Sequence, residues 1–309
     1  MGRILAVAVN TFREAVRDRV LYGVVGIATA VLLFTLVLAE LSLDQHLRVV
    51  LDVGLASISF FSVLVAIFLG SSLLYKEIER KTLYVILPKP IHRYEFLLGK
   101  YCGITLTATV FVAIMGAVQL GVTTLQAGGR AVWVLAAALG LPVLLALWVY
   151  RARDRTAVVV PWSMLALLTL SLIASQADVA LWPILAALGL NVAEVLVLTA
   201  VALFFSSFST PFLTALFTAG VWLVGRSADT MTGIKSDAIP QAVKDLLAQL
   251  VKVWPNFNLF VPGRRALEVP LSESVGPLSY VVNNAIYAGC YAAIVLALAA
   301  LIFQRRDFL

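Results

Sequence analysis

Few side chains of this sequence could carry out catalysis. The two histidines, His46 and His92, lie in different polar segments separated by long apolar stretches, so they predict neither a zinc pair nor the base of a nucleophilic site. The Gly-Lys pair at residues 99–100 lacks the phosphate-binding pattern, because Tyr94 replaces its first glycine and Tyr101 its hydroxyl residue. We therefore expect no catalytic residue, no metal site and no ATP hydrolysis in this chain.

One carboxylate, Glu194, falls inside an apolar stretch, and Gln119 falls inside another. A carboxylate at the centre of a bilayer costs about 2.5–3.5 kcal/mol on insertion scales, so it should face protein or water. Both residues are candidates for an intramembrane polar site. Glu194 could be hydrogen-bonded inside a helix bundle, lie at the outer interface, or contact a transported ion or substrate.

The segment 76–96 combines charges of both signs with a short apolar piece, which ends at Pro88 and Pro90. A solvated basic loop would account for its lysines and arginines, but not for the apolar residues among them. This pattern indicates a docking element. Its candidate contact residues are Glu77, Glu79, Arg80, Lys81, Thr82 and Leu83.

The composition places these residues in a membrane protein. Apolar residues make up 61% of the 309 residues and charged residues 13%, against roughly 45–50% and 25% in soluble domains. The apolar stretches have the length of membrane-spanning helices rather than barrel strands, so we expect an all-α polytopic fold. Eight stretches qualify: 20–40, 53–75, 97–121, 131–150, 157–175, 181–206, 209–225 and 281–303. The seventh is short, and it could share a tight turn with the sixth.

Charge distribution gives the orientation and the division of the chain. With the N-terminus inside, 15 of the 23 Lys and Arg residues lie on the inner side, so both termini are expected to be cytoplasmic. The net charge of +6 is then explained by the basic residues on the inner side of the membrane, and we expect no binding of nucleic acid. The expected regions are an amphipathic helix (1–19), two spans (20–75), the charged loop (76–96), five spans (97–225), an outer loop with an amphipathic helix (226–280), and the last span and tail (281–309).

The pattern of residues 1–19 predicts a helix at the membrane interface. Leu5, Val9, Phe12 and Val16 form its apolar stripe, and charged residues occupy the opposite side. At the start of the third span, Gly99 and Gly103 have the spacing that permits close helix contact, either within the chain or between two copies.

Five motifs resemble those of type-2 ATP-binding-cassette (ABC) transporter permeases, and they occur in the order found in that family. The strongest covers the charged loop, Glu77-x-Glu79-Arg-Lys-Thr82-Leu, and continues to Gly99-Lys100. The others are Asn10-Thr-Phe-Arg-Glu-Ala-Val-Arg-Asp-Arg19, Ala202-Leu-Phe-Phe-Ser-Ser-Phe-Ser-Thr-Pro211, Trp254-Pro-Asn-Phe-Asn258 and Gln304-Arg-Arg-Asp-Phe-Leu309. Members of this family usually have six spans, and residues 131–175 resemble an inserted pair.

The resemblance implies a permease subunit, with an exporter favoured, in the bacterial cytoplasmic (inner) membrane. It would form a homodimer or pair with another permease, contact membrane lipid, and bind two cytoplasmic ABC ATPase subunits that carry the ATP and Mg²⁺. The six loop residues named above would couple the two proteins, with Arg13 and Arg17 as secondary contacts. Two alternatives stay open: an ion-coupled secondary transporter that uses Glu194, and a non-transporting membrane scaffold of an ATPase complex.

Overall fold

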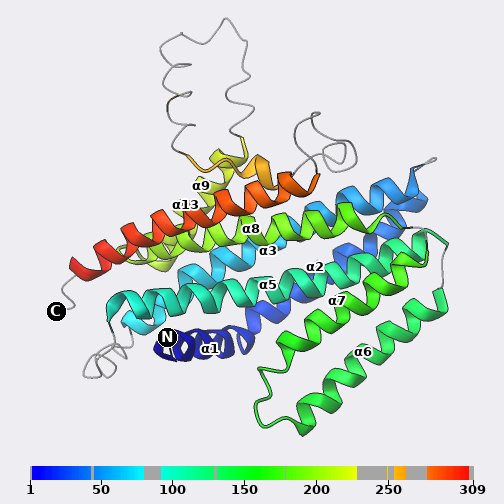
Figure 1. Ribbon diagram of the computed structural model, residues 1–309, viewed down its shortest axis with the longest axis horizontal. Coiled ribbons are helices and arrows are strands. Elements are labelled where there is room, and N and C mark those ends of the chain that lie inside the picture. The colour runs from blue at the N-terminus through cyan, green and yellow to red at the C-terminus, as the bar shows by residue number, and fades with distance from the viewer. Residues whose placement is uncertain are drawn as a thin grey trace, which may run out of the picture.

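The computed structural model describes residues 2–42, 45–79, 92–128, 131–177, 179–227, 249, 254–261 and 277–305. Within these residues the chain is helical and contains no strand, as the sequence predicts. The longest helices run side by side in an elongated bundle (Figure 1). The elements are α1 (Gly2–Val16), α2 (Arg19–Glu40), α3 (His46–Glu79), α5 (Arg93–Gln126), α6 (Ala131–Arg151), α7 (Val159–Ser175), α8 (Leu181–Ser206), α9 (Pro211–Arg226), the 3₁₀ helix η1 (Phe257–Phe260) and α13 (Pro277–Arg305).

Six of the described helices are long and apolar enough to cross a membrane. They are Arg19–Glu40, His46–Leu73, Arg93–Gln126, Ala131–Arg151, Leu181–Ser206 and Leu278–Phe303. The other two predicted spans, 157–175 and 209–225, form the shorter apolar helices α7 and α9. The chain is therefore a multi-pass helical membrane protein.

The helices α3 and α5 extend beyond the apolar stretches that predicted them. Each has 34 residues, which corresponds to about 51 Å at 1.5 Å per residue, whereas the hydrocarbon core of a bilayer is about 30 Å thick. Hydropathy detects the apolar part of a helix and not its polar continuation. The end of α3 and the start of α5 consequently flank the charged loop as helical extensions of two spans.

The core of the bundle consists mainly of α5 and α8. Of their apolar windows, 67% and 72% are buried within the chain. Small residues allow this close packing, since a Cβ at Gly116 of α5 would lie 2.5 Å from Leu188 Cδ1 of α8. In lipid, helix association depends on such contacts because lipid tails are as apolar as leucine.

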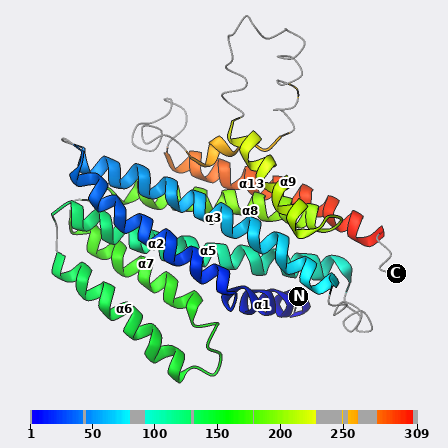
Figure 2. The ribbon, with the colours of Figure 1, turned by 180° about the vertical axis from the view of Figure 1, so that it is seen from behind.

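The predicted inserted pair, α6 and α7, lies at the rim of the bundle. α7 packs against α5, and α6 is outermost in both views (Figures 1 and 2). Trp162 Nε1 of α7 donates to Leu141 O of α6 at 2.8 Å. Only 6% of the apolar window of α6 is buried within the described chain. α6 therefore lies largely outside the core, whereas α7 contributes Leu170 and Ala174 to it.

The helix α9 is too short for a full crossing. Its 16 residues extend about 24 Å, and its last residue, Arg226, contacts Glu194 in the middle of α8. A Cβ at Gly225 would lie 2.3 Å from Pro255 O, and Trp254 Nε1 donates to Val221 O at 3.0 Å. The segment 254–261 thus covers the end of α9 deep in the bundle.

The helix α1 packs against the first part of α5 at two glycines. A Cβ at Gly99 would lie 2.5 Å from Val7 Cβ, and a Cβ at Gly103 would lie 2.5 Å from Thr11 Cβ. These glycines therefore serve contact within the chain, which was one of the two options that their spacing left open. Asp18 separates α1 from α2, because its Oδ1 accepts a hydrogen bond from the Val20 N–H at the start of α2 (3.0 Å).

We predict that Gly103→Leu displaces α1 from α5. The new side chain would overlap both Thr11 and the backbone of α1, and such overpacking typically costs about 1–3 kcal/mol. The apparent melting temperature of the detergent-purified protein should fall. Gly26→Leu in α2 is the matched control, since a Cβ there meets nothing within 4 Å. Equal melting temperatures for the two variants would contradict the packing role of Gly103.

Candidate functional site

The predicted ATPase-coupling residues fall largely on the loop between α3 and α5. Glu77 and Glu79 belong to the last turn of α3, but their side chains lie outside the described residues. Arg80, Lys81, Thr82 and Leu83 also lie outside the described residues. Arg13 lies on α1, and Arg17 lies in the turn that directly follows it. The described part of the candidate site therefore consists of the helices that hold this loop.

The first turn of α5 connects three helices. Glu95 Oε2 accepts a hydrogen bond from the His92 N–H at 3.0 Å, and it lies 3.9 Å from Arg3 Nη1 of α1. Arg93 Nη1 donates to Phe303 O of α13 at 3.1 Å. The rings of Phe96 and Phe303 stack with their centroids 6.4 Å apart. A displacement of the start of α5 would thus reach both the N-terminal and the C-terminal helix.

A buried lysine forms a second connection between α1 and α5. Lys100 is 1% exposed, and its Nζ lies 3.7 Å from Glu14 Oε2 and 5.9 Å from the centre of the Phe96 ring. A buried charge is costly unless it is paired. The Gly-Lys pair at residues 99–100, which has the wrong context for binding phosphate, therefore supplies helix contact and an ion pair.

The buried face of α1 differs from the predicted apolar stripe. Ala8, Thr11, Phe12 and Ala15 are buried, whereas Leu5 is 66% exposed. The periodicity analysis selected large apolar residues, but close approach to the α5 glycines requires small ones. Residues 2–16 form a helix, and Phe12 is the only member of the predicted stripe that is buried within the described chain.

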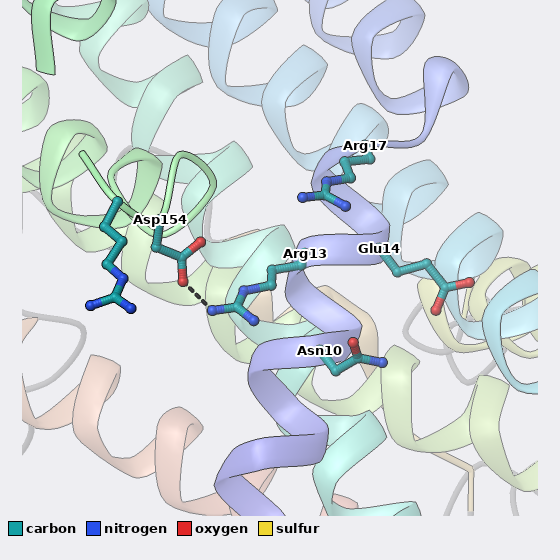
Figure 3. Close-up of a pocket in the computed structure, with 6 residues that line it drawn as sticks. Asn10, Arg13, Glu14, Arg17 and Asp154 are labelled. Atoms are coloured by element: carbon teal, nitrogen blue, oxygen red, sulfur yellow. Dashed lines mark hydrogen bonds and ion pairs between the residues drawn. The ribbon is translucent and has the colours of Figure 1, made fainter. Parts of the chain in front are cut away.

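Arg13 forms an ion pair with Asp154, which lies in the turn between α6 and α7. Figure 3 shows Arg13 extended towards Asp154, with Glu14 on the other side of α1. Asp154 Oδ1 also accepts a hydrogen bond from Thr156 Oγ1 at 3.3 Å. Asn10, Arg13, Glu14, Arg17, Arg153 and Asp154 line a cleft of about 770 Å³ at this contact.

Sequence analysis did not identify the contact between α1 and this turn. The turn, residues 151–155, contains three arginines, a composition typical of an inner loop. Asp154 is the acidic residue among them, but nothing in hydropathy or spacing indicates which distant arginine it pairs with. Through this contact the hairpin of α6 and α7 is attached to α1.

Glu194 is fully buried and bound by side chains of two other helices, α3 and α9. Its Oε2 accepts from Ser59 Oγ of α3 at 2.9 Å, and its Oε1 accepts from Trp222 Nε1 at 2.9 Å. Arg226 Nη1 of α9 lies 3.2 Å from the same Oε1 and 3.3 Å from Phe257 O of η1. Both oxygens of the carboxylate therefore have protein donors. Of the readings that the sequence left open, the geometry matches a residue hydrogen-bonded inside the bundle.

Gln119 lies in a different environment. Its Nε2 donates to Val50 O of α3 at 3.0 Å. A Cβ at Gly54 would lie 2.0 Å from Gln119 Oε1, so the glycine makes room for the amide. Gln119 and Glu194 contact different stretches of α3, and no contact joins them within the described residues. The two candidates do not form one polar site.

We predict that Arg226→Met destabilises the protein because it leaves the Glu194 carboxylate buried without its cation. Breaking a buried pair typically costs about 3–5 kcal/mol. Adding Glu194→Gln should recover part of the loss, since the uncompensated charge is then removed. Thermal unfolding of the single and double variants measures this coupling.

Arg48→Met is the matched control for that comparison. Arg48 pairs with Asp52 at 3.6 Å, and both side chains are more than half exposed. Loss of an exposed pair should cost less than about 1 kcal/mol. If the effects of Arg226→Met and Glu194→Gln simply add, the two residues are not coupled as described.

Comparison with known families gives a match that spans nearly the whole chain. A family model described as ABC-2 family transporter protein matches residues 5–308. A search among curated proteins finds no significant match. The matched region includes every described helix apart from the first residues of α1. The chain therefore belongs to the ABC-2 family of transporter proteins and is a membrane permease component.

Proposed function

We propose that this chain is the permease subunit of an ABC exporter in the bacterial cytoplasmic membrane. Two permease subunits, identical or paired, form the translocation path, and two separate cytoplasmic ATPase subunits bind and hydrolyse ATP with Mg²⁺. Both termini and the loop between α3 and α5 face the cytoplasm. The observation that carries this proposal is the family match over residues 5–308.

The connections around α5 support transmission of force from an ATPase. In this proposal Glu77, Glu79, Arg80, Lys81, Thr82 and Leu83 contact the ATPase, and Arg13 of α1 and Arg17 just after it are secondary contacts. The start of α5 is joined to α1 through Arg3–Glu95 and Glu14–Lys100, and to α13 through Arg93. Motion of the loop would thereby move α5 together with α1 and α13. In this scheme the charged contacts orient the ATPase and the apolar contacts supply burial.

The environment of Glu194 weighs against an ion-coupled carrier. A coupling ion needs free ligands near the middle of the membrane. Here Ser59, Trp222 and Arg226 already donate to the carboxylate. The position of Glu194 accords with a structural pair that holds α9 and η1 against α8. The scaffold alternative shares the same docking loop, and cargo transport by the purified complex distinguishes it from a permease.

The interior of the bundle favours an apolar or amphipathic cargo. The largest group of buried residues comes from apolar side chains of α3, α5, α8 and α13. A hydrophilic cargo would require a polar lining along the path, because lipid and apolar side chains cannot replace its hydration. A lipid or peptide-like molecule is the cargo class that this interior suits.

We predict that Glu79→Arg and Arg80→Glu each prevent association with the ATPase. Placing like charges opposite each other at an interface costs several kcal/mol, so co-purification of the ATPase should fall more than tenfold. Permease-stimulated ATP hydrolysis should fall with it. Both quantities are measured on the complex reconstituted in nanodiscs.

Arg48→Glu is the control for charge reversal, because Arg48 lies at the opposite end of α3. It should leave both measurements unchanged. Normal co-purification and normal stimulation in both loop variants would contradict the coupling assignment. Cargo movement into vesicles without any ATPase would instead contradict the permease assignment itself.

A further inference from the structure

An apolar crevice of about 430 Å³ lies between α2 and the α6–α7 pair, with α5 behind it. Val25 of α2, Phe111 of α5, Val149 of α6 and Trp162 of α7 represent its four sides. Its exposed lining is almost entirely apolar apart from Arg155 and Thr156 at one end. The crevice is therefore suited to hydrocarbon, with a cation at its mouth.

The positive charges of Arg153 and Arg155 near this mouth have no acidic partner within the described chain. Asp154 already pairs with Arg13 and accepts from Thr156. Arg153 and Arg155 are both exposed, and in the part of the chain that the structure describes neither forms an ion pair. The turn thus presents two cations to whatever approaches the crevice from its charged end.

The cleft beside α1 adjoins this crevice. Arg153 and Asp154 line the cleft, while the next two residues, Arg155 and Thr156, line the crevice. Arg17, just after α1, lines the cleft, and Val16, the last residue of α1, lines the crevice. Neighbouring residues thus line both spaces, so a cleft with three arginines lies beside an apolar crevice, an arrangement that suits an amphiphile with an anionic head.

The depth of the crevice matches the acyl region of one leaflet. Its lining begins at Leu21 and ends at Val25 on α2, and on α5 it runs from Thr107 to Ile114. Seven residues of helix correspond to about 11 Å, compared with about 15 Å for half of the hydrocarbon core. The arginines then lie at the level of the lipid headgroups.

An acyl chain suits the crevice, because the exposed lining is almost entirely apolar and a cation lies at one end. Basic pockets between membrane helices bind the headgroups of anionic lipids, which combine the required charge and apolar chain.

We propose that this crevice binds an anionic phospholipid, with its phosphate on Arg153 and Arg155 and an acyl chain between α2 and the α6–α7 pair. The bound lipid joins the rim pair to the remainder of the bundle at the end where α1 contacts the turn. This inference concerns a site away from the coupling loop, and it does not depend on the proposed function.

The test measures lipid binding to the full-length protein by native mass spectrometry and by melting temperature in detergent. Phosphatidylglycerol should bind and raise the melting temperature, whereas phosphatidylcholine should do neither. Arg155→Gln should weaken phosphatidylglycerol binding about fivefold, the effect expected for one basic contact at a membrane surface. The matched control is Arg48→Gln, which should leave binding unchanged.

A second pair of variants tests the apolar part of the site. Val149→Trp fills the crevice without changing any charge, so it should also weaken phosphatidylglycerol binding. The control is Leu147→Trp, because Leu147 is exposed on α6 and does not line the crevice. If Val149→Trp does not fold, Val25→Trp fills the same space from α2.

Three results would overturn the proposal. Equal binding of the two lipids would show that the headgroup charge is not recognised. Competition by glycerol 3-phosphate at the concentration of the lipid would indicate a site for soluble anions. Unchanged binding in Arg155→Gln, or in a folded crevice-filling variant, would show that the lipid lies elsewhere on the protein.

Discussion

The structure depends on the close packing of other helices against α5. In lipid the hydrophobic effect does not drive helices together, so contact between well-matched surfaces has to do so. Gly99 and Gly103 accept α1, and Gly116 accepts Leu188 of α8. The same helix begins directly after the charged loop, so the element that organises the bundle is directly linked to the segment proposed to bind the ATPase.

The charged residues Lys100 and Glu194 inside the bundle each have an oppositely charged partner nearby. Lys100 is held by Glu14 and Phe96, and Glu194 by Arg226 and two neutral donors. Each group joins helices that are distant in sequence. Glu194 in particular fixes a helix that stops halfway across the bundle, which accounts for a carboxylate deep in an otherwise apolar helix.

The sequence predicted the helices well and their contacts poorly. Hydropathy located all the apolar stretches, because each span must be apolar over most of its length. It underestimated α3 and α5, whose ends are polar. It could not show that Glu194 meets Arg226, or that Arg13 meets Asp154, since neither pair is close in sequence. It gave no indication of the side of α1 that packs against α5, because the small residues on that side carry little hydropathic weight.

The positions of α6 and α7 bear on how much each contributes to the bundle. The pair starts and ends on the same side of the bundle, between α5 and α8, and α6 buries 6% of its apolar window. Loss of α6 would leave mainly apolar side chains facing lipid tails, which solvate them as well as a neighbouring helix does. Loss of α7 would in addition uncover the part of α5 that contacts Leu167 and Leu170, and loss of the turn before it would leave Arg13 without Asp154. The outer helix of this hairpin is therefore the more dispensable of the two.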